Sequence, residues 1–207
     1  MTASPTSIDL DRLTQDISFR SMRPMQIERF EIAQFGQRLG TRMEGEHARA
    51  QLIALLHSLP EDGQIRISLD KIDVLSTSFS DELIGRTLQP LVLGEFGDRT
   101  LVLESPALDL ADGINVKLAQ RQLAMLCLVK GEWHLIGART PAMTDTLKLI
   151  IDKGQTTAKE LAGELGLQMN ACVNRVARLA KLHLIRREQI GMSGPQAIYT
   201  LHSILPS

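Results

Sequence analysis

Alternating apolar and polar residues in the first two thirds of the chain predict β-strands. The segment Ile65-Arg-Ile-Ser-Leu alternates in this way, which is the pattern of a strand with one buried face. The last predicted pair of strands forms a hairpin that turns at Gly131-Glu132. The two strands of this hairpin cover residues 123–130 and 133–136. Two further strands are predicted at residues 27–32 and 99–104.

Segments with helical spacing lie between these strands. Residues 42–58 carry Ala48, Leu52 and Leu56 at i, i+4 and i+8, which predicts an amphipathic helix. A second helix is predicted to follow the Ser- and Thr-rich segment after Leu75 and to stop before Pro90, and a weaker third one covers residues 107–118. This order of elements indicates an α/β domain over residues 23–138, with helices packed against a mixed sheet.

The last third of the chain has a different pattern, three helical segments and then a hairpin. Thr140 is a suitable N-cap before Pro141, and Thr157-Ala-Lys-Glu160 has the sequence of a capping box. The predicted helices cover residues 141–153, a segment after Thr157, and residues 168–181. Residues 184–188 and 197–201 alternate as two strands, so residues 139–207 are predicted as an α+β domain. Residues 1–22 are predicted to be a disordered tail.

The third of these helices has two different faces. Its apolar side is predicted to consist of Cys172, Val173, Val176, Leu179 and Ala180. Asn, Gln, Arg and Lys side chains occupy the other side, and these residue types bind base edges and phosphates. The pattern therefore fits a DNA recognition helix, and it also fits the solvated face of an ordinary amphipathic helix.

The segment around these helices resembles the winged helix-turn-helix regulators of the MarR and ArsR type. The resemblance rests on residues 156–167, on Val173-Asn-Arg-Val-Ala-Arg-Leu and on Leu182-His-Leu-Ile-Arg-Arg. It implies a homodimer that binds double-stranded DNA through the third helix and the hairpin, or wing. The wing tip, Gly191-Met-Ser-Gly, has no Lys or Arg, so wing contacts are expected from its base. The implied DNA-binding residues are Thr157, Gln168, Asn170, Asn174, Arg175, Arg178, Lys181, Arg186 and Arg187.

A second resemblance lies in the loop Ser76-Thr-Ser-Phe-Ser-Asp-Glu-Leu83. It is similar to the loop of STAS-like domains, which are relatives of anti-sigma-factor antagonists. This likeness implies a phosphosite or partner-binding loop of Ser76, Thr77, Ser78 and Ser80, with Ser78 as the modified residue and a histidine-kinase-like ATPase as the partner. Ser76 and Phe79 stand where the antagonists have Asp and Gly. The alternative is that Ser78, three residues before Asp81, is a helix N-cap.

Charge and composition add to this picture. From residue 141 to the end, eight Lys and Arg face five Asp and Glu, whereas the rest of the chain has 15 basic and 19 acidic residues. A basic part joined to an acidic part suggests two modules with different partners. The two cysteines form no CxxC pair and are expected to be buried, reduced thiols, and no apolar run has the length of a membrane span, so a cytoplasmic protein is expected.

Catalytic and metal-binding motifs are absent from the sequence. The five histidines show no metal-ligand spacing, and no GxSxG, GxGxxG or P-loop motif occurs. We therefore expect no enzyme activity, no cofactor and no metal. The leading hypothesis is a DNA-binding transcription regulator whose STAS-like domain senses a signal or binds a partner. The alternative is a partner-switching module whose winged helix mediates docking or oligomerisation.

Overall fold

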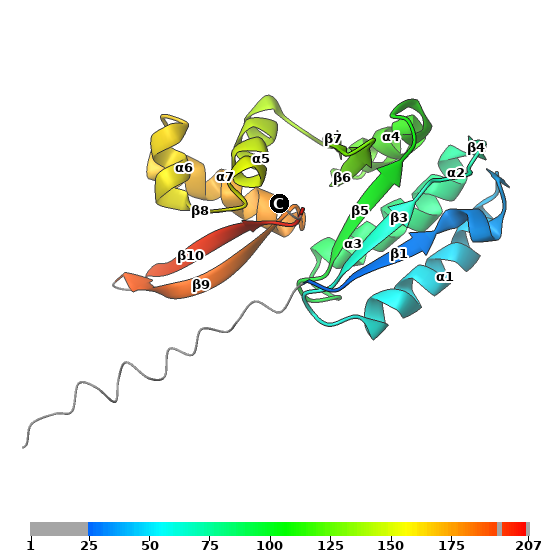
Figure 1. Ribbon diagram of the computed structural model, residues 1–207, viewed down its shortest axis with the longest axis horizontal. Coiled ribbons are helices and arrows are strands. Elements are labelled where there is room, and N and C mark those ends of the chain that lie inside the picture. The colour runs from blue at the N-terminus through cyan, green and yellow to red at the C-terminus, as the bar shows by residue number, and fades with distance from the viewer. Residues whose placement is uncertain (1–24, 194–195, 206–207) are drawn as a thin grey trace, which may run out of the picture.

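The computed structural model describes residues 25–193 and 196–205, so the predicted tail and part of the predicted wing tip lie outside the described residues. The fold is mixed α/β and contains one large sheet and two small ones (Figure 1). The large sheet has five strands in the order β1-β3-β5-β6-β7. Four of them run parallel, and β7 is antiparallel to β6, so the predicted mixed sheet is confirmed. Its strands are β1 (Ile27–Glu31), β3 (Gln64–Ser68), β5 (Thr100–Ser105), β6 (Ala124–Val129) and β7 (Glu132–Gly137).

Helices from residues 25–138, the N-terminal part, cover one face of this sheet (Figure 1). The first, α1 (Arg42–Ser58), has the predicted bounds, because Thr41 and Glu44 form a capping box that fixes its start. The core on this face combines Ile65, Ile67 and Leu103 of the strands with buried residues of the helices. The other helical elements are η2 (Ile32–Phe35), α2 (Thr77–Ser80), the π-helical turn η3 (Asp81–Gly85), α3 (Arg86–Val92), η4 (Asp109–Ala111) and α4 (Asp112–Gln120).

The prediction that the second helix stops before Pro90 is wrong. The chain stays helical from α2 through η3 into α3 and includes Pro90. Leu88 and Leu91, on either side of the proline, are buried in the core, with at most 2% of their surface exposed. Packing therefore holds this turn in a helix although Pro90 donates no backbone hydrogen bond.

Residues 139–205, the C-terminal part, form three helices and a three-stranded antiparallel sheet of order β8-β10-β9. Thr140 caps the first helix by accepting a hydrogen bond from the Met143 N–H, and Pro141 is its first residue, as predicted. The elements are α5 (Pro141–Lys153), β8 (Gln155–Thr157), α6 (Ala158–Glu164), α7 (Met169–Lys181), β9 (Ile185–Ser193) and β10 (Gln196–Ser203). The short strand β8, and the two-stranded sheet of β2 (Arg38–Leu39) and β4 (Val74–Leu75), are not visible in the residue pattern.

The C-terminal part packs on the second face of the large sheet. Val102, Leu126 and Leu135 of the sheet share one buried cluster with residues of α5, α6 and α7. The second face of β3 is buried as well, which corrects the prediction that the strand at residues 65–69 has only one buried face. Gln64 and Ser68 of β3 are fully buried on the other face, and the Gln64 amide donates a hydrogen bond to the Ile204 carbonyl over 2.9 Å.

Gly137, the last residue of β7, leaves no room for a side chain, and this close packing leads to a stability prediction. A Cβ on Gly137 would clash with the Leu123 carbonyl oxygen, and the φ of Gly137 is 95°. We expect Gly137→Ala to lower the free energy of unfolding by about 3 kcal/mol or more, because it adds a backbone clash to left-handed strain. Urea unfolding measures this loss.

Gly131 provides the matched control for that substitution. Its φ is 87°, but nothing lies within 4 Å of an added Cβ. Gly131→Ala should therefore cost only about 1–2 kcal/mol, the strain of the backbone conformation alone. Equal losses in the two variants would contradict the close contact at Gly137.

Candidate nucleic-acid interface

The start of α6 is fixed by the predicted capping box. The Thr157 hydroxyl accepts a hydrogen bond from the Glu160 N–H, and the Glu160 carboxylate accepts one from the Thr157 N–H over 2.9 Å. The Thr156 hydroxyl donates a further bond to the same carboxylate, and these bonds lower the pKa of Glu160. Thr157 thus has its hydroxyl engaged in the cap, and its contribution to the site is to hold α6 in place.

The outward face of α7 carries most of the predicted DNA-binding residues. Cys172, Val176 and Leu179 are buried at i, i+4 and i+7, and they attach the helix to the C-terminal core. Arg175 lies at the edge of the buried stripe and is half-buried. The helix contains no Asp or Glu. The exposed polar residues of α7 are Asn170, Asn174, Arg178 and Lys181.

Two features of α7 differ from the sequence prediction. Val173 was assigned to the apolar side, but 45% of its surface is exposed. It lies about 100° around the helix from Cys172, outside the narrow stripe that contacts the core. Gln168 was placed inside the helix, whereas it is the extended N-cap residue and is exposed. Gln168 therefore stands at the N-terminal end of the polar face.

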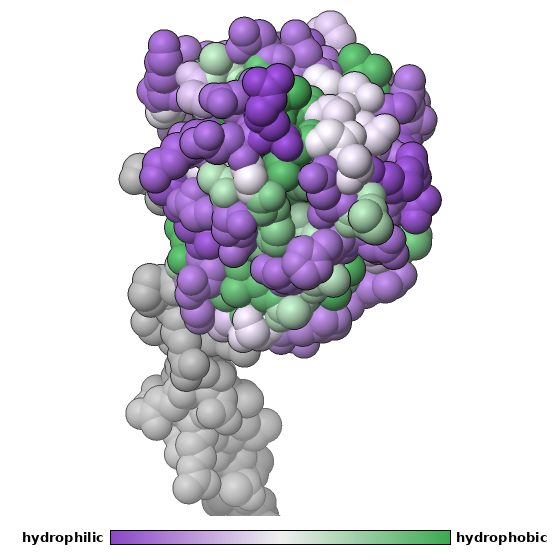
Figure 2. Space-filling model, turned by 90° about the vertical axis from the view of Figure 1, so that its right-hand side faces the viewer, coloured by the Kyte–Doolittle hydropathy of each residue, from purple (hydrophilic) through white to green (hydrophobic). Residues whose placement is uncertain are grey.

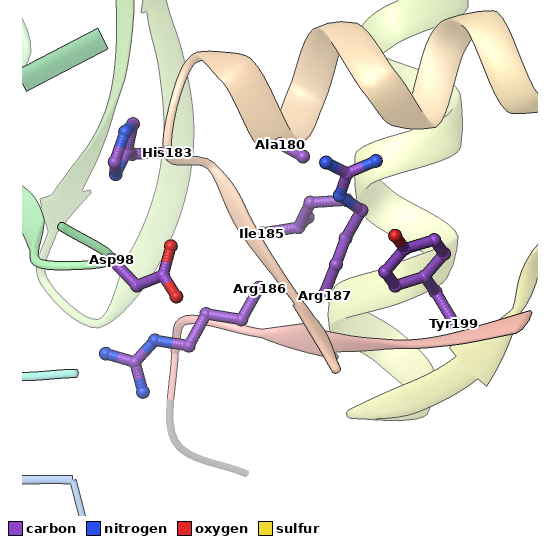
Figure 3. A pocket seen from close by; sticks show the side chains of 7 residues that line it. All are labelled: Asp98, Ala180, His183, Ile185, Arg186, Arg187 and Tyr199. Atoms are coloured by element: carbon purple, nitrogen blue, oxygen red, sulfur yellow. The ribbon is translucent and has the colours of Figure 1, made fainter. Parts of the chain in front are cut away.

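Arg186 and Arg187, at the base of the hairpin, point in different directions (Figure 3). Arg187 is exposed, and its guanidinium carbon lies 5.1 Å from the centre of the Tyr199 ring. Arg186 is turned toward the N-terminal part, where it donates a hydrogen bond to the Asp62 carbonyl, and burial lowers its pKa. Arg186, which was predicted to bind DNA together with Arg187, therefore lies on the other side of the strand and faces the junction, because consecutive residues of a strand project to opposite sides.

The serine loop has a different cap from the predicted one. Ser76, and not Ser78, caps α2: its hydroxyl accepts a hydrogen bond from the Phe79 N–H and donates one to the Gly40 carbonyl. The helix begins at Thr77, so Ser78 lies inside its first turn. Ser80 is buried and donates to the Ser76 carbonyl, whereas Thr77 and Ser78 are exposed.

Two buried carboxylates after this loop were not identified from the sequence. Asp81 accepts two hydrogen bonds from Arg121, and these lower the pKa of Asp81. Glu82 is only 2% exposed and lies within 3.3 Å of Arg42, Arg49 and Arg86. Arg42 and Arg121 lie 40 residues away from their partners in sequence, so spacing gives no signal for these pairs, and only Arg86 stands at a helical spacing, i+4, from Glu82. They hold η3 against α1 and α4, and burial of a paired charge requires such partners.

Other chemistry is sparse in the part of the chain that the structure describes. No group of three or more His, Cys, Asp or Glu there is arranged to bind a metal. Cys127 and Cys172 are free and buried as predicted, and burial raises the pKa of Cys127 to about 11. No helix among residues 25–193 and 196–205 has the length and hydropathy to cross a membrane. On the end of the molecule that carries α1 and α4, hydrophobic residues lie between hydrophilic ones (Figure 2).

Comparison of the chain with protein-family models, curated proteins and solved structures gave no match. The geometry of the chain's own residues therefore carries the functional argument.

His183 joins the end of α7 to the N-terminal part. Its φ is 55°, and its Nδ1 lies 2.9 Å from the Arg99 carbonyl oxygen. Since a carbonyl only accepts, Nδ1 donates this bond. Burial is the main cause of the lowered pKa of His183, and the bond to Arg99 and the charge of Asp98 oppose it. The neutral ring is therefore the form that the junction accommodates.

This histidine predicts a pH dependence of stability. Because its folded pKa lies below the ordinary histidine pKa of 6.5, its contribution to stability is complete above pH 6.5 and is lost as the pH falls through the folded pKa. We expect His183→Asn, which tolerates the positive φ and does not titrate, to reduce the dependence of the unfolding free energy on pH below 6.5. Urea unfolding at a series of pH values measures the slope. A variant with the full wild-type slope would show that another group causes it.

Proposed function

We propose that the protein is a DNA-binding transcription regulator whose C-terminal part is a winged helix-turn-helix domain. The observation that carries the proposal is the outward face of α7, where two amides and two cations are exposed and no carboxylate is present. In this assignment α6 and α7 form the helix-turn-helix, and β9 and β10 form the wing. The N-terminal part, proposed as a STAS-like domain, receives a signal or binds a partner.

The residue types of α7 suit a recognition helix in the major groove. An Asn side chain can pair with adenine through two hydrogen bonds, and Arg can do so with guanine. Asn170, Asn174 and Arg178 follow one another along the same face, so they would meet successive base edges. Lys181, at the end of α7, and Arg187, on the wing, would contact phosphates. Their charge would make binding depend strongly on salt.

A homodimer is part of this proposal. A single helix reads only a few base pairs, and regulators of this kind bind two half-sites that mirror the symmetry of the protein. The buried junction fixes the direction of α7 relative to the N-terminal part. Contacts between N-terminal parts of two chains would therefore set the spacing of the two recognition helices.

The test uses full-length protein and a duplex recovered by selection from a random DNA library. Asn174→Ala combined with Arg178→Ala should weaken binding to that duplex by about 100-fold or more, because each lost base contact costs about 1–3 kcal/mol. Arg178→Ala alone distinguishes two roles of Arg178. If Arg178 neutralises a phosphate, the substitution should reduce the slope of log affinity against log salt concentration by about 1. If Arg178 binds a base, the slope should stay nearly unchanged. Fluorescence anisotropy measures both quantities.

Arg38→Ala is the matched control. Arg38 is an exposed cation on β2 of the N-terminal part, so its removal changes the net charge equally but leaves α7 intact. Affinity close to wild type is expected for it. Equal losses of affinity in the control and the α7 variants would show that binding depends only on net charge and not on α7. Failure to select any duplex would overturn the DNA-binding function.

A further inference from the structure

A pocket of about 440 Å³ lies where the two parts of the chain meet. Its wall comes from three places: η4 and α4, the strand β7 with the segment after it, and α5. The pocket is separate from the outward face of α7, because none of its lining residues belongs to α6, α7 or the hairpin. Its size is in the range of small-molecule sites in proteins. The lining residues are Leu108, Ala111, Asp112, Asn115, Trp133, His134, Leu135, Ile136, Arg139, Thr144 and Lys148.

The pocket follows the outer edge of β7. This strand is the last of the large sheet and pairs only with β6 there. Gly137 donates its N–H to the Asn115 side chain over 2.9 Å, and the Leu135 carbonyl accepts a bond from Arg139 over 3.1 Å. In an antiparallel pair, every second residue directs its backbone N–H and C=O away from the partner strand. Trp133 alternates with Leu135 and Gly137, so its backbone groups also point away from β6. The sheet edge thus presents backbone polar groups beside the Trp133 ring.

The charge on the wall is mainly positive. Arg139 donates hydrogen bonds to two neutral oxygens, those of Asn115 and Leu135, and forms no ion pair among the described residues. Lys148 is 66% exposed and is 3.5 Å from Asp152, an exposed pair in which water screens the attraction. Asp112 is the one acidic residue on the wall. Two cations therefore face one carboxylate beside an apolar floor that includes the half-buried Trp133.

We propose that this pocket binds a small organic anion with a flat apolar body. The body would lie against Trp133 and Leu135, and its carboxylate or sulfonate group would be held by Arg139 and Lys148. A bidentate bond to Arg139 suits such a group, because two N–H groups of the guanidinium can bond two oxygens of one carboxylate or sulfonate. A few charged groups on the wall of a pocket with an apolar floor are a usual basis of specificity in ligand sites.

The position of the pocket suggests what the ligand does. Lys148 and Thr144 belong to α5, whereas Trp133 and Asn115 belong to the N-terminal part, so one ligand touches both parts. The helix α5 also packs against α7 and β10. A ligand that draws Lys148 toward Arg139 would change the angle at which α7 is presented. This regulatory role rests on the proposed DNA-binding function, whereas the binding site itself does not.

The test is a direct binding measurement with a matched pair of probes. The anion is 1-anilinonaphthalene-8-sulfonate, and the neutral counterpart is N-phenyl-1-naphthylamine, which lacks only the sulfonate. Trp133 is the only tryptophan of the chain, so quenching of its emission reports binding near the pocket. With full-length protein we expect saturable binding of the anion at one site per chain, and at least tenfold weaker binding of the neutral probe.

Variants locate the anion. Lys148→Gln and Arg139→Gln should each weaken binding of the sulfonate probe about tenfold or more and leave binding of the neutral probe unchanged. Lys148→Arg, which keeps the positive charge, should bind the sulfonate probe about as well as the wild type does. Lys159→Gln is the control, since Lys159 is an exposed cation of α6 outside the pocket. Equal affinity for the two probes, or wild-type affinity in both Lys148→Gln and Arg139→Gln, would overturn the anion site.

A second arm separates the site from its role. The affinity for the selected duplex is measured with and without saturating sulfonate, and the expected result is a change of fivefold or more that Lys148→Gln abolishes. Unchanged DNA affinity at saturation would overturn the coupling and leave the binding site intact. Because the first arm contains no DNA, failure of the proposed DNA-binding function and failure of the anion site give different results.

Discussion

Burial of the second face of the five-stranded sheet by the C-terminal part is the contact on which the rest of the structure depends. Val102, Leu126 and Leu135 project from that face into the same cluster as Leu147 and Ile150 of α5. Each such side chain contributes about 1.5–3 kcal/mol when it leaves water. The sheet therefore has a core on each side, one made by its own helices and one shared with the C-terminal part. Neither part can turn freely, because turning would expose this shared surface.

The same contact decides which basic side chains are available to bind DNA. His183 and Arg186 lie at the end of α7 and the start of the hairpin, and both are committed to carbonyls of the N-terminal part. The junction thus takes up one of the two hairpin arginines and leaves Arg187, with the polar face of α7, directed away from the sheet. A basic residue near a recognition helix is not by itself a DNA contact, because it can equally satisfy the backbone of a neighbouring element.

The sequence predicted best what depends on neighbours along the chain. Residues 42–58 and the capping boxes at Thr41 and Thr157 follow from local spacing and side-chain hydrogen bonds, although only the box at Thr157 was recognised from the residues alone. Errors arose where distant segments decide. The second buried face of β3, the helix through Pro90 and the direction of Arg186 all depend on packing partners tens of residues away. Val173 was misassigned because a helical period does not show how wide the buried stripe is.

The helix α5 lines the proposed ligand pocket and also packs against the proposed recognition helix, α7. The packing of α5 therefore limits how a ligand could act. Its inner residues Leu147 and Ile150 are fully buried, so a ligand cannot loosen α5 without the cost of exposing them. A ligand shifts an equilibrium only by its difference in affinity for the two states. Those states would be, in the proposed regulator, two packed orientations of α5 on the sheet that differ in the distance between Lys148 and Arg139. In the proposed regulator, the signal is thus a small rotation of the whole C-terminal part, and not the ordering of a disordered segment.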